Sequence, residues 1–312
     1  MARKVQHSLL RNAKTNKKDE FYTQLVDIES ELKHYENHFK DKVVYNNCDD
    51  PRVSNFFNYF SSNFEKLGLK KIITASYNNQ GKGFFCNYNH DSISNINNIN
   101  IVKFKEDGDF RSRESIELLK QSDIVVTNPP FSLFREYVEQ LIKYNKKFLI
   151  IGNVNAITYK EIFKLIKGNE AWLGINLGRG ISGFIVPEHY DLYGTETRID
   201  SSGNRIVSPN NCLWLTNLDT SKRHEDIVLS KTYYGNESEY PKYDNYDGIN
   251  VSRTKDIPMD YKGYMGVPIT FLHKFNPDQF EIIKFRKGDD EKDLSINGKC
   301  PYFRILIKNK RL

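Results

Sequence analysis

Asn128 begins the run Asn-Pro-Pro-Phe (128–131), whose residue types could activate an amino group for attack on a methyl donor. Two acceptors aimed at the two hydrogens of a planar amine would draw its nitrogen toward tetrahedral geometry and free its lone pair. The side-chain carbonyl of Asn128 and the main-chain carbonyl of Pro129 can supply them. Because a residue before proline is confined to extended conformations and proline fixes φ, both oxygens are held before a substrate arrives.

The exocyclic amino group of adenine needs such help, since its lone pair is delocalised into the ring. Pro130 keeps the chain extended, and Phe131 then offers a flat face on which an extruded base could stack. The run thus favours methylation of a base amino group. Proline cannot donate to a sheet ladder, however, so the same residues are also a common way to end a strand, and a purely structural turn stays open as an alternative.

The elements that must position this run alternate between strands and helices over the first half of the chain. Strands are predicted at 42–47, 70–77, 100–104, 124–127 and 147–154, and helices at 28–39, from Pro51 onward, at 113–121 and at 133–144. The alternation predicts an α/β fold with a mostly parallel sheet covered on both faces. In such sheets ligands bind beyond the carboxyl ends of the strands, which is where Asp49, Asp109 and Asn128 follow.

Two segments of this first half are predicted from local signals. Asp50 is expected to be a helix N-cap, with Pro51 at the first helical position. Residues 80–100 are polar and rich in asparagine, which indicates an irregular surface insertion.

The second half of the chain has a different composition. Short strands are still predicted near 172–178, 183–190 and 211–217, but residues 233–268 are rich in Tyr, Gly, Pro, Asn and Asp. We expect this stretch to be ordered by aromatic anchors and to act as a recognition region, although ordinary packing of the tyrosines stays open.

The net charge of +6 on 312 residues is placed unevenly. Residues 1–18 contain no acid and carry six cations, which are Arg3, Lys4, Arg11, Lys14, Lys17 and Lys18. Residues 299–312 are basic as well, so the rest of the chain is mildly acidic. Two basic ends favour a polyanionic partner such as nucleic acid, with solvated tails as the alternative.

Several classes of protein are disfavoured. The four cysteines are scattered without a C-x-x-C pair, so we expect neither a disulfide framework nor a metal site. The chain lacks an apolar run of membrane-spanning length, and its first residues lack the features of a signal peptide. We therefore expect a cytoplasmic protein without a membrane partner.

Motifs in this order resemble those of the EcoRI-type DNA adenine methyltransferases, a family of amino methyltransferases that use S-adenosylmethionine. The matching segments are "DEFYTQ" (19–24), "NCDDPRVSNFF" (47–57), "DGDF" (107–110) and "DIVVTNPPFSLF" (123–134), with further matches at 183–196, 208–219, 266–277 and 290–310. The resemblance implies a Rossmann-like methyltransferase fold with motifs in a γ-like order. It implies a basic arm over 1–18, a catalytic core over 19–180, and remaining core strands with a target recognition region over 181–312.

The resemblance also implies roles for individual residues. Phe21, Tyr22 and Thr23 match the first cofactor motif, Asp49 and Asp50 lie where the family is usually rich in glycine, and Asp109 and Phe110 match the segment that contacts the adenine of the cofactor. Asn128, Pro129, Pro130 and Phe131 match the catalytic motif, and the six arm cations would contact DNA. The chain departs from the family pattern in lacking G-x-G after the first strand and an acid at the tip of the second, where Ser76 or Tyr77 could substitute.

The implied reaction is base flipping and adenine methylation in duplex DNA, at GAATTC and on its inner adenine. The chain would be the modification arm of a restriction-modification system, with a cognate endonuclease acting on the same site without stable association. Two alternatives stay open, which are a methyltransferase acting on RNA or on protein glutamine, and a non-catalytic DNA-binding module that retains the fold. The basic ends and the tyrosine-rich tail favour DNA.

Overall fold

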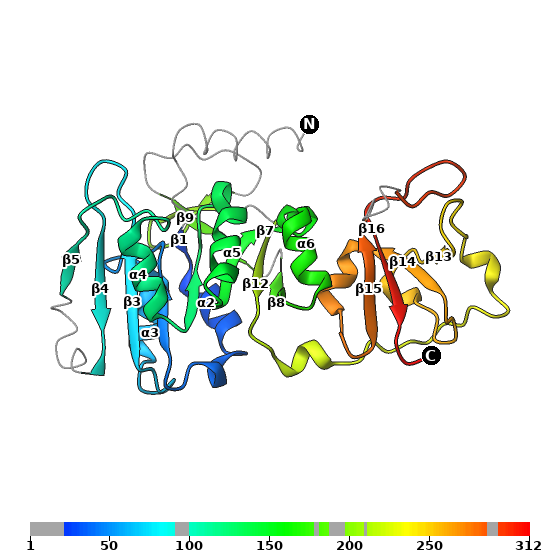
Figure 1. Ribbon diagram of the computed structural model, residues 1–312, viewed down its shortest axis with the longest axis horizontal. Helices are drawn as coiled ribbons and strands as arrows, with labels where there is room; N and C mark the ends of the chain where they lie inside the picture. Colours follow the sequence, from blue (N-terminus) through cyan, green and yellow to red (C-terminus); the bar gives the residue numbers. More distant parts are fainter. Residues whose placement is uncertain (1–21, 91–99, 178–180, 187–196, 209–210, 286–292) are drawn as a thin grey trace. The chain divides into compact units, whose positions relative to one another are not determined.

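The computed structural model describes residues 22–90, 100–177, 181–186, 197–208, 211–285 and 293–312 (Figure 1). These residues form two compact units. The first unit runs to Ile162 and continues through Trp172–Leu218, and the second comprises Phe163–Ala171 and Asp219–Leu312. None of the described helices is long and apolar enough to cross a membrane.

A mixed eight-stranded sheet forms the centre of the described part of the first unit (Figure 1). In spatial order its strands are β5 (Ile101–Lys103), β4 (Phe84–Tyr88), β3 (Lys71–Ser76), β2 (Val43–Asn46), β6 (Ile124–Thr127), β7 (Lys147–Asn153), β12 (Cys212–Thr216) and β8 (Trp172–Leu177). β2 pairs in parallel with β3 and β6, and β6 with β7, whereas the outer pairs are antiparallel. The predicted α/β class is confirmed, with a parallel core that antiparallel strands extend on either side.

Helices pack on both faces of this sheet. They are α2 (Leu25–Leu32), α3 (Asn55–Ser62), α4 (Arg113–Gln121) and α5 (Phe134–Lys143). Helix α6 (Lys160–Lys167) begins in the first unit and continues into the second. Ile28 of α2 and Phe56 of α3 share a buried cluster with Ile151 of β7. The next residue, Gly152, points to the other face, where an added Cβ would lie 2.5 Å from the ring of Phe134 on α5. The central strands β2, β6 and β7 are therefore buried on both sides, which explains their continuous apolar sequences.

Short 3-10 helices occur in the described parts of both units. They are η1 (Glu36–His38), η3 (Phe131–Leu133), η4 (Val154–Thr158), η6 (Ser221–His224), η7 (Glu237–Glu239), η8 (Thr254–Asp256) and η9 (Ile269–Lys274). The helix predicted over 28–39 is in fact α2, which ends at Leu32, followed by η1. Tyr35 and Phe39 are buried nevertheless, which accounts for the apolar spacing beyond the end of α2.

Helix α3 begins later than the sequence predicts. Its N-cap is Ser54, whose hydroxyl accepts from two backbone N–H groups of the first turn at 3.1 and 3.2 Å. The prediction that Asp50 caps this helix and that Pro51 opens it is wrong. The Asp50 carboxylate is bound instead by Arg52, within the turn that precedes the helix.

The segment 80–100 also differs from the prediction, because Phe84–Tyr88 forms β4, inserted between β3 and β5. Cys86 and Tyr88 are buried while Asn87 between them is exposed, which is the alternation of a strand with one covered face. The sequence signal of this short strand was weak because asparagines surround it. Residues 91–99 of the segment lie outside the described residues.

A smaller four-stranded sheet joins β1 (Tyr22–Thr23), β9 (Phe184–Val186), β11 (Arg205–Val207) and β10 (Thr197–Ile199), in that order. Ser182, just before β9, anchors it to α2, because Asp27 accepts from the Ser182 hydroxyl at 2.9 Å and from its backbone N–H at 3.0 Å. Gln24 donates to the same hydroxyl at 2.6 Å. The segment that carries Tyr22 is therefore fixed between α2 and β9.

The described part of the second unit contains a four-stranded sheet in the order β13 (Gly248–Asn250), β14 (Tyr264–Pro268), β16 (Arg304–Asn309) and β15 (Phe280–Phe285). Tyr233, Tyr240 and Tyr243 are buried in the tyrosine-rich stretch beside it. The Tyr240 hydroxyl donates to the main-chain carbonyl of Asp256 at 3.0 Å. Aromatic anchors are thus present within 233–268, and β13 and β14 contribute regular structure as well.

Candidate active site

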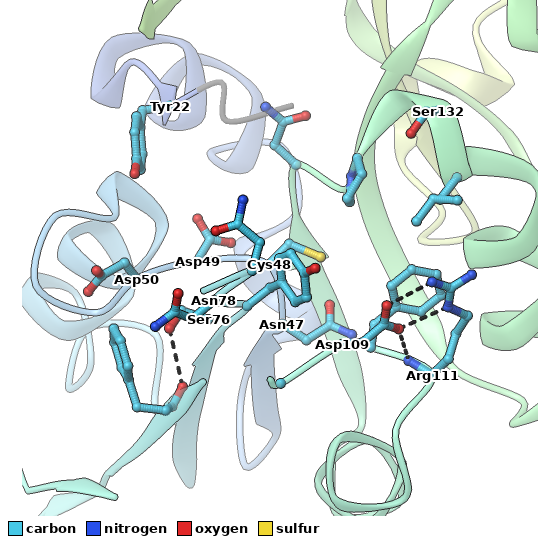
Figure 2. A pocket seen from close by; sticks show the side chains of 18 of the residues that line it. Tyr22, Asn47, Cys48, Asp49, Asp50, Ser76, Asn78, Asp109, Arg111 and Ser132 are labelled. Carbon is cyan, nitrogen blue, oxygen red and sulfur yellow. Dashed lines mark hydrogen bonds and ion pairs between the residues drawn. The ribbon is translucent and has the colours of Figure 1, made fainter. Parts of the chain in front are cut away.

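A pocket of about 480 Å³ lies in the first unit at the carboxyl ends of β2, β3 and β6 (Figure 2). Its lining consists of Tyr22, Asn47, Cys48, Asp49, Asp50, Arg52, Ser76, Tyr77, Asn78, Asn79, Phe84, Gly108, Asp109, Phe110, Arg111, Asn128, Pro130, Ser132 and Leu133. Segments far apart in the sequence therefore meet at one edge of the sheet, the edge at which ligands bind in such folds.

Most of the site residues predicted from the sequence meet in this pocket. Those that line it are Tyr22, Asp49, Asp50, Asp109, Phe110, Asn128 and Pro130. Thr23 and Pro129 are buried outside the lining, and Phe131 packs against Phe184 of β9, with ring centroids 6.0 Å apart. Phe21 and the six arm cations lie outside the described residues.

Asp49 is buried between the tips of β2 and β6. The Thr127 hydroxyl donates to its carboxylate at 2.6 Å and the Ser54 hydroxyl at 2.8 Å. Burial raises the pKa of Asp49 from its ordinary 3.8 to about 6, although both hydroxyls oppose the rise. Among the described residues no lysine or arginine pairs with this carboxylate, so its negative charge is uncompensated within the pocket wall.

Asp109 forms an ion pair with Arg111. The Oδ1 atom of Asp109 accepts from the backbone N–H and from Nε of Arg111 at 2.8 and 2.9 Å, and Oδ2 accepts from Nη2 at 2.7 Å. Burial acts to raise the pKa of Asp109, but the hydrogen bonds from Arg111 outweigh it and lower the pKa. Gly108, with φ of +81°, allows this loop to lie against β3, since an added Cβ would be 2.4 Å from the Ser76 carbonyl oxygen.

Asp50 repeats this arrangement with Arg52. Its Oδ1 accepts from the backbone N–H and from Nε of Arg52, both at 2.9 Å, and its Oδ2 accepts from Nη2 at 2.6 Å and from Nε at 3.2 Å. The Arg52 guanidinium lies 4.3 Å from the ring centroid of Phe84 on β4, and Phe84 pairs with Ser76 at the end of β3. The Asp50–Arg52 pair and the Asp109–Arg111 pair are therefore both anchored at the tip of β3.

Helix α5, which follows the Asn-Pro-Pro-Phe run, holds the Asp109 loop in place. Its Glu136 accepts from Arg111 Nη1 at 2.9 Å, and its Gln140 side chain donates to the Phe110 carbonyl at 3.1 Å. The Tyr137 ring lies edge-on to Phe110, with centroids 5.0 Å apart. The loop near Asp109 and the loop after β6 thus share one support.

Arg52, Arg111 and Thr127 contribute to the site without having been identified from the sequence. Each arginine stands two residues after a pocket aspartate, at 50–52 and at 109–111. This repeated Asp-x-Arg spacing was the available signal. The sequence around Thr127 contained no such signal, because the hydrogen bond from Thr127 to Asp49 depends on β2 and β6 being neighbours in the sheet.

The pocket can hold a small polar molecule. Its volume is within the range of about 300–1,000 Å³ that is usual for small-molecule and cofactor sites. Carboxylates at three points offer acceptors, and Asn128 stands at the edge nearest β6. No group of residues suited to holding a metal ion occurs in the described part of the chain.

Comparison with known proteins gives one consistent family. The family model described as "Adenine-specific methyltransferase EcoRI" matches residues 9–310. The chain is 68% identical to "Type II methyltransferase M.EcoRI" of Escherichia coli, over 100% of this chain and 99% of the relative. It is 38% identical to M.MgeORF184P of Mycoplasma genitalium and to M.MpnI of Mycoplasma pneumoniae, over 96% of this chain and 98% and 97% of those relatives. No solved structure matches it.

Proposed function

The chain belongs to the EcoRI family of adenine-specific DNA methyltransferases, and we propose that it transfers a methyl group from S-adenosylmethionine to adenine in duplex DNA at GAATTC. The observation that carries this proposal is the meeting of Asn128 with three carboxylates in one pocket at the strand tips. The parallel core β3-β2-β6-β7 supports a Rossmann-like methyltransferase fold for the first unit.

The residues present suit the cofactor. The adenosine part of S-adenosylmethionine is neutral and rich in hydrogen-bond donors. Its methionine part has a net charge of +1, because a sulfonium and an ammonium group face a single carboxylate. The pocket matches both, because Asp50 and Asp109 are acceptors that already carry a counterion, whereas Asp49 is a buried carboxylate without one. Tyr22, Thr23 and Phe110 complete the cofactor site that we assign.

The catalytic step rests on the residues after β6. When bound, S-adenosylmethionine supplies an electrophilic methyl group and leaves as the neutral thioether S-adenosylhomocysteine. The Asn128 side-chain carbonyl and the Pro129 main-chain carbonyl accept from the amino group of a flipped adenine and orient its lone pair, so that a carbon–nitrogen bond forms as the carbon–sulfur bond breaks. The amino nitrogen then releases its extra proton to water. Pro130 fixes the extended turn, and Phe131, supported by Phe184, offers its ring to the base.

DNA binding is assigned to the basic arm and to the C-terminal part. We assign residues 1–18 to phosphate contact, 19–180 to the catalytic core and 181–312 to the remaining strands and target recognition, within which the second unit starts its main segment at Asp219. Deleting residues 2–14 removes four of the six arm cations. Each lost phosphate contact should reduce the slope of log affinity against log salt by about 0.9. An unchanged slope would make the arm a solvated tail.

The 68% identity to M.EcoRI over the whole chain supports GAATTC as the site, and we propose that the methyl group is placed on its inner adenine. As a modification methyltransferase it would protect the site from a cognate endonuclease. The test is to express the chain in a host without adenine methylation and to map methyladenine across the genome at single-base resolution. Methylation concentrated at another motif would overturn the specificity, and soluble protein that leaves no methyladenine would overturn the reaction.

A further inference from the structure

Two buried asparagines, Asn46 and Asn47, stand at the carboxyl end of β2, directly after the run Val-Val-Tyr (43–45). Asn46 is fully buried and Asn47 is 4% exposed. A buried amide is costly unless it is hydrogen-bonded, and an apolar residue would continue the strand without that cost. The partners of the two side chains therefore indicate why polar residues stand at this point.

Strands β2 and β6 separate where Asn46 stands. β2 pairs with β6 only as far as Tyr45 and Val125, whereas β6 stays paired with β7 through Thr127. One residue beyond the last pair, a side chain makes the link, because Asn46 Nδ2 donates to the main-chain carbonyl of Val126 at 2.6 Å. A side-chain amide reaches farther than a backbone N–H, so it joins two strands that have begun to diverge toward the pocket.

Thr74 on β3 sets the orientation of the Asn46 amide. It lies opposite Asn46 in the register, is fully buried, and donates from its hydroxyl to Asn46 Oδ1 at 3.3 Å. An amide has its acceptor on one side and its donors on the other. With the oxygen held by Thr74, the NH₂ group faces Val126. One chain of side-chain bonds thus joins β3, β2 and β6 at their ends.

Asn47, which lines the pocket (Figure 2), makes a link to the chain beyond the Asn-Pro-Pro-Phe run. Its Oδ1 accepts from the hydroxyl of Tyr137, a fully buried residue of α5. The run (128–131) lies between Val126 and Tyr137 in the sequence. The chain on either side of the run is therefore attached to two successive residues at the end of β2.

These attachments matter because the run itself is stiff. The prolines at 129 and 130 fix φ, so the position of the run depends on the segments that hold its two ends. A displacement of about 1 Å at a reacting group can lower a rate by about a hundredfold. Apolar residues at 46 and 47 would fill the space but remove the bonds to the Val126 carbonyl and to the Tyr137 hydroxyl.

We propose that Asn46 and Asn47 are positioning residues for methyl transfer, which hold the acceptors of Asn128 and Pro129 in place from the two sides of the run. Thr74 takes part by orienting the Asn46 amide. This inference rests on the proposed function, because it takes the residues after β6 as the place of the reaction. Loss of either attachment should therefore slow the chemical step more than it weakens binding.

The test compares single-turnover methyl transfer, at saturating cofactor and GAATTC duplex, with equilibrium binding of S-adenosylhomocysteine and of the duplex. Asn46→Leu keeps the volume and removes both bonds of the amide, so the rate should fall about ten- to hundredfold. Tyr137→Phe removes only the hydroxyl that binds Asn47, and the rate should fall about three- to tenfold. Both variants should bind each ligand within about threefold of wild type.

Thr216→Val is the matched control. Thr216 is fully buried on β12 and donates to the main-chain carbonyl of Phe148, near the amino end of β7, at 2.7 Å. The variant removes the same kind of bond between strands at the opposite edge of the sheet, so it should lower stability and leave the single-turnover rate unchanged. An Asn46→Leu rate equal to that of Thr216→Val would overturn the proposal.

Thr74 offers a second pair of variants, which serves if Asn46→Leu fails to fold by circular dichroism. Thr74→Val removes the donor that orients the amide and should lower the rate about three- to tenfold. Thr74→Ser keeps that donor and should restore the rate of wild type. Added to Asn46→Leu, Thr74→Val should cause no further loss of rate, because both act through one amide.

The outcomes separate this inference from the proposed function. A rate in Thr74→Ser as low as in Thr74→Val would overturn the role of the hydroxyl, and wild-type rates in all of these variants would overturn the positioning role alone. A wild-type chain that transfers no methyl group to adenine would overturn the proposed function together with this inference.

Discussion

The aspartates that border the pocket in the first unit differ in their surroundings from two loop aspartates of the second unit. In the second unit Asp260 accepts from the backbone N–H groups of Tyr233 and Tyr234 at 2.6 and 3.3 Å, and Asp244 accepts from those of Asn297 and Gly298 at 3.1 and 2.9 Å. These carboxylates close loops. In the first unit Asp49, Asp50 and Asp109 stand at strand ends and border a cavity.

The pKa of Asp244 and the pKa of Asp49 are shifted in opposite directions. Backbone hydrogen bonds, from Gly298 above all, lower the pKa of Asp244, so its charged form is stabilised by the fold itself. Burial raises the pKa of Asp49 to about 6, so its charged form is disfavoured by the fold. A carboxylate that closes a loop contributes to the folded state, whereas one that the fold disfavours indicates a site that a ligand completes.

The largest effect is expected at the catalytic end of the first unit. Asn128→Ala should lower methyl transfer by about two to three orders of magnitude while S-adenosylhomocysteine and DNA still bind, because it removes one pre-positioned acceptor at the reacting nitrogen. Single-turnover kinetics with a saturating cofactor measures the step. Asn63→Ala, at the C-cap of α3, is the control for loss of an asparagine near the same sheet. Turnover by Asn128→Ala close to that of the control would contradict the proposed mechanism.

The next effect concerns Asp49 and the pH. Between pH 3.8 and about 6 the folded chain holds a proton on Asp49 that the unfolded chain has lost, so the contribution of the protonated side chain to stability is complete below pH 3.8 and disappears as the pH rises through 6. A shift of about two pKa units corresponds to about 3 kcal/mol. Asp49→Asn removes this dependence, and its free energy of unfolding should rise relative to wild type by that amount from pH 4 to pH 7.

The same substitution should weaken binding of S-adenosylmethionine more than that of S-adenosylhomocysteine, because only the former carries a net positive charge. The variant would then be more stable at neutral pH but would bind the cofactor less tightly. Denaturant unfolding of wild type and Asp49→Asn at pH 4, 5.5 and 7 measures the change in stability. Titration calorimetry measures the change in binding of the two cofactor forms. A stability difference between wild type and Asp49→Asn that stays constant from pH 4 to pH 7 would mean that folding does not shift the pKa of Asp49. The contrast between the units would then lose its main support.

The sequence predicted the central elements of the first unit well. The helix at 113–121 and the strand at 124–127 have the predicted bounds, because their apolar spacing is regular and flanked by polar residues. It failed where tertiary contacts decide the outcome. Asp50 and Pro51 have the residue types of a helix start, but Arg52 binds the Asp50 carboxylate and Ser54 becomes the cap. Strand β4 needs β3 and β5 on either side, and its own sequence gives a weak signal.

The candidate site was predicted as a set of positions rather than as a geometry. Asp49, Asp109 and Asn128 were placed at one edge from strand order alone, and all three line the same pocket. Which aspartates carry a counterion was not predicted, although Arg52 and Arg111 stand close to them in sequence. That property depends on the conformation of each loop, since the arginine must fold back onto a residue only two positions earlier.

The smallest effect tests the second unit. Tyr243 is buried and donates to Asn250 Oδ1 at 3.0 Å, while Asn250 also receives Arg304 Nε at 2.8 Å. Tyr243→Phe therefore removes one hydrogen bond without leaving Asn250 unsatisfied, and should lower the free energy of unfolding by about 0.5–1.5 kcal/mol. Tyr234→Phe is the matched control, because that side chain is 65% exposed and its loss of a hydroxyl should change little. Both variants should bind S-adenosylhomocysteine like wild type, as measured by calorimetry. A clear loss of cofactor affinity in Tyr243→Phe, absent from Tyr234→Phe, would show that the polar network of the second unit serves the site after all, and the distinction between loop-closing and ligand-binding polar groups would then fail.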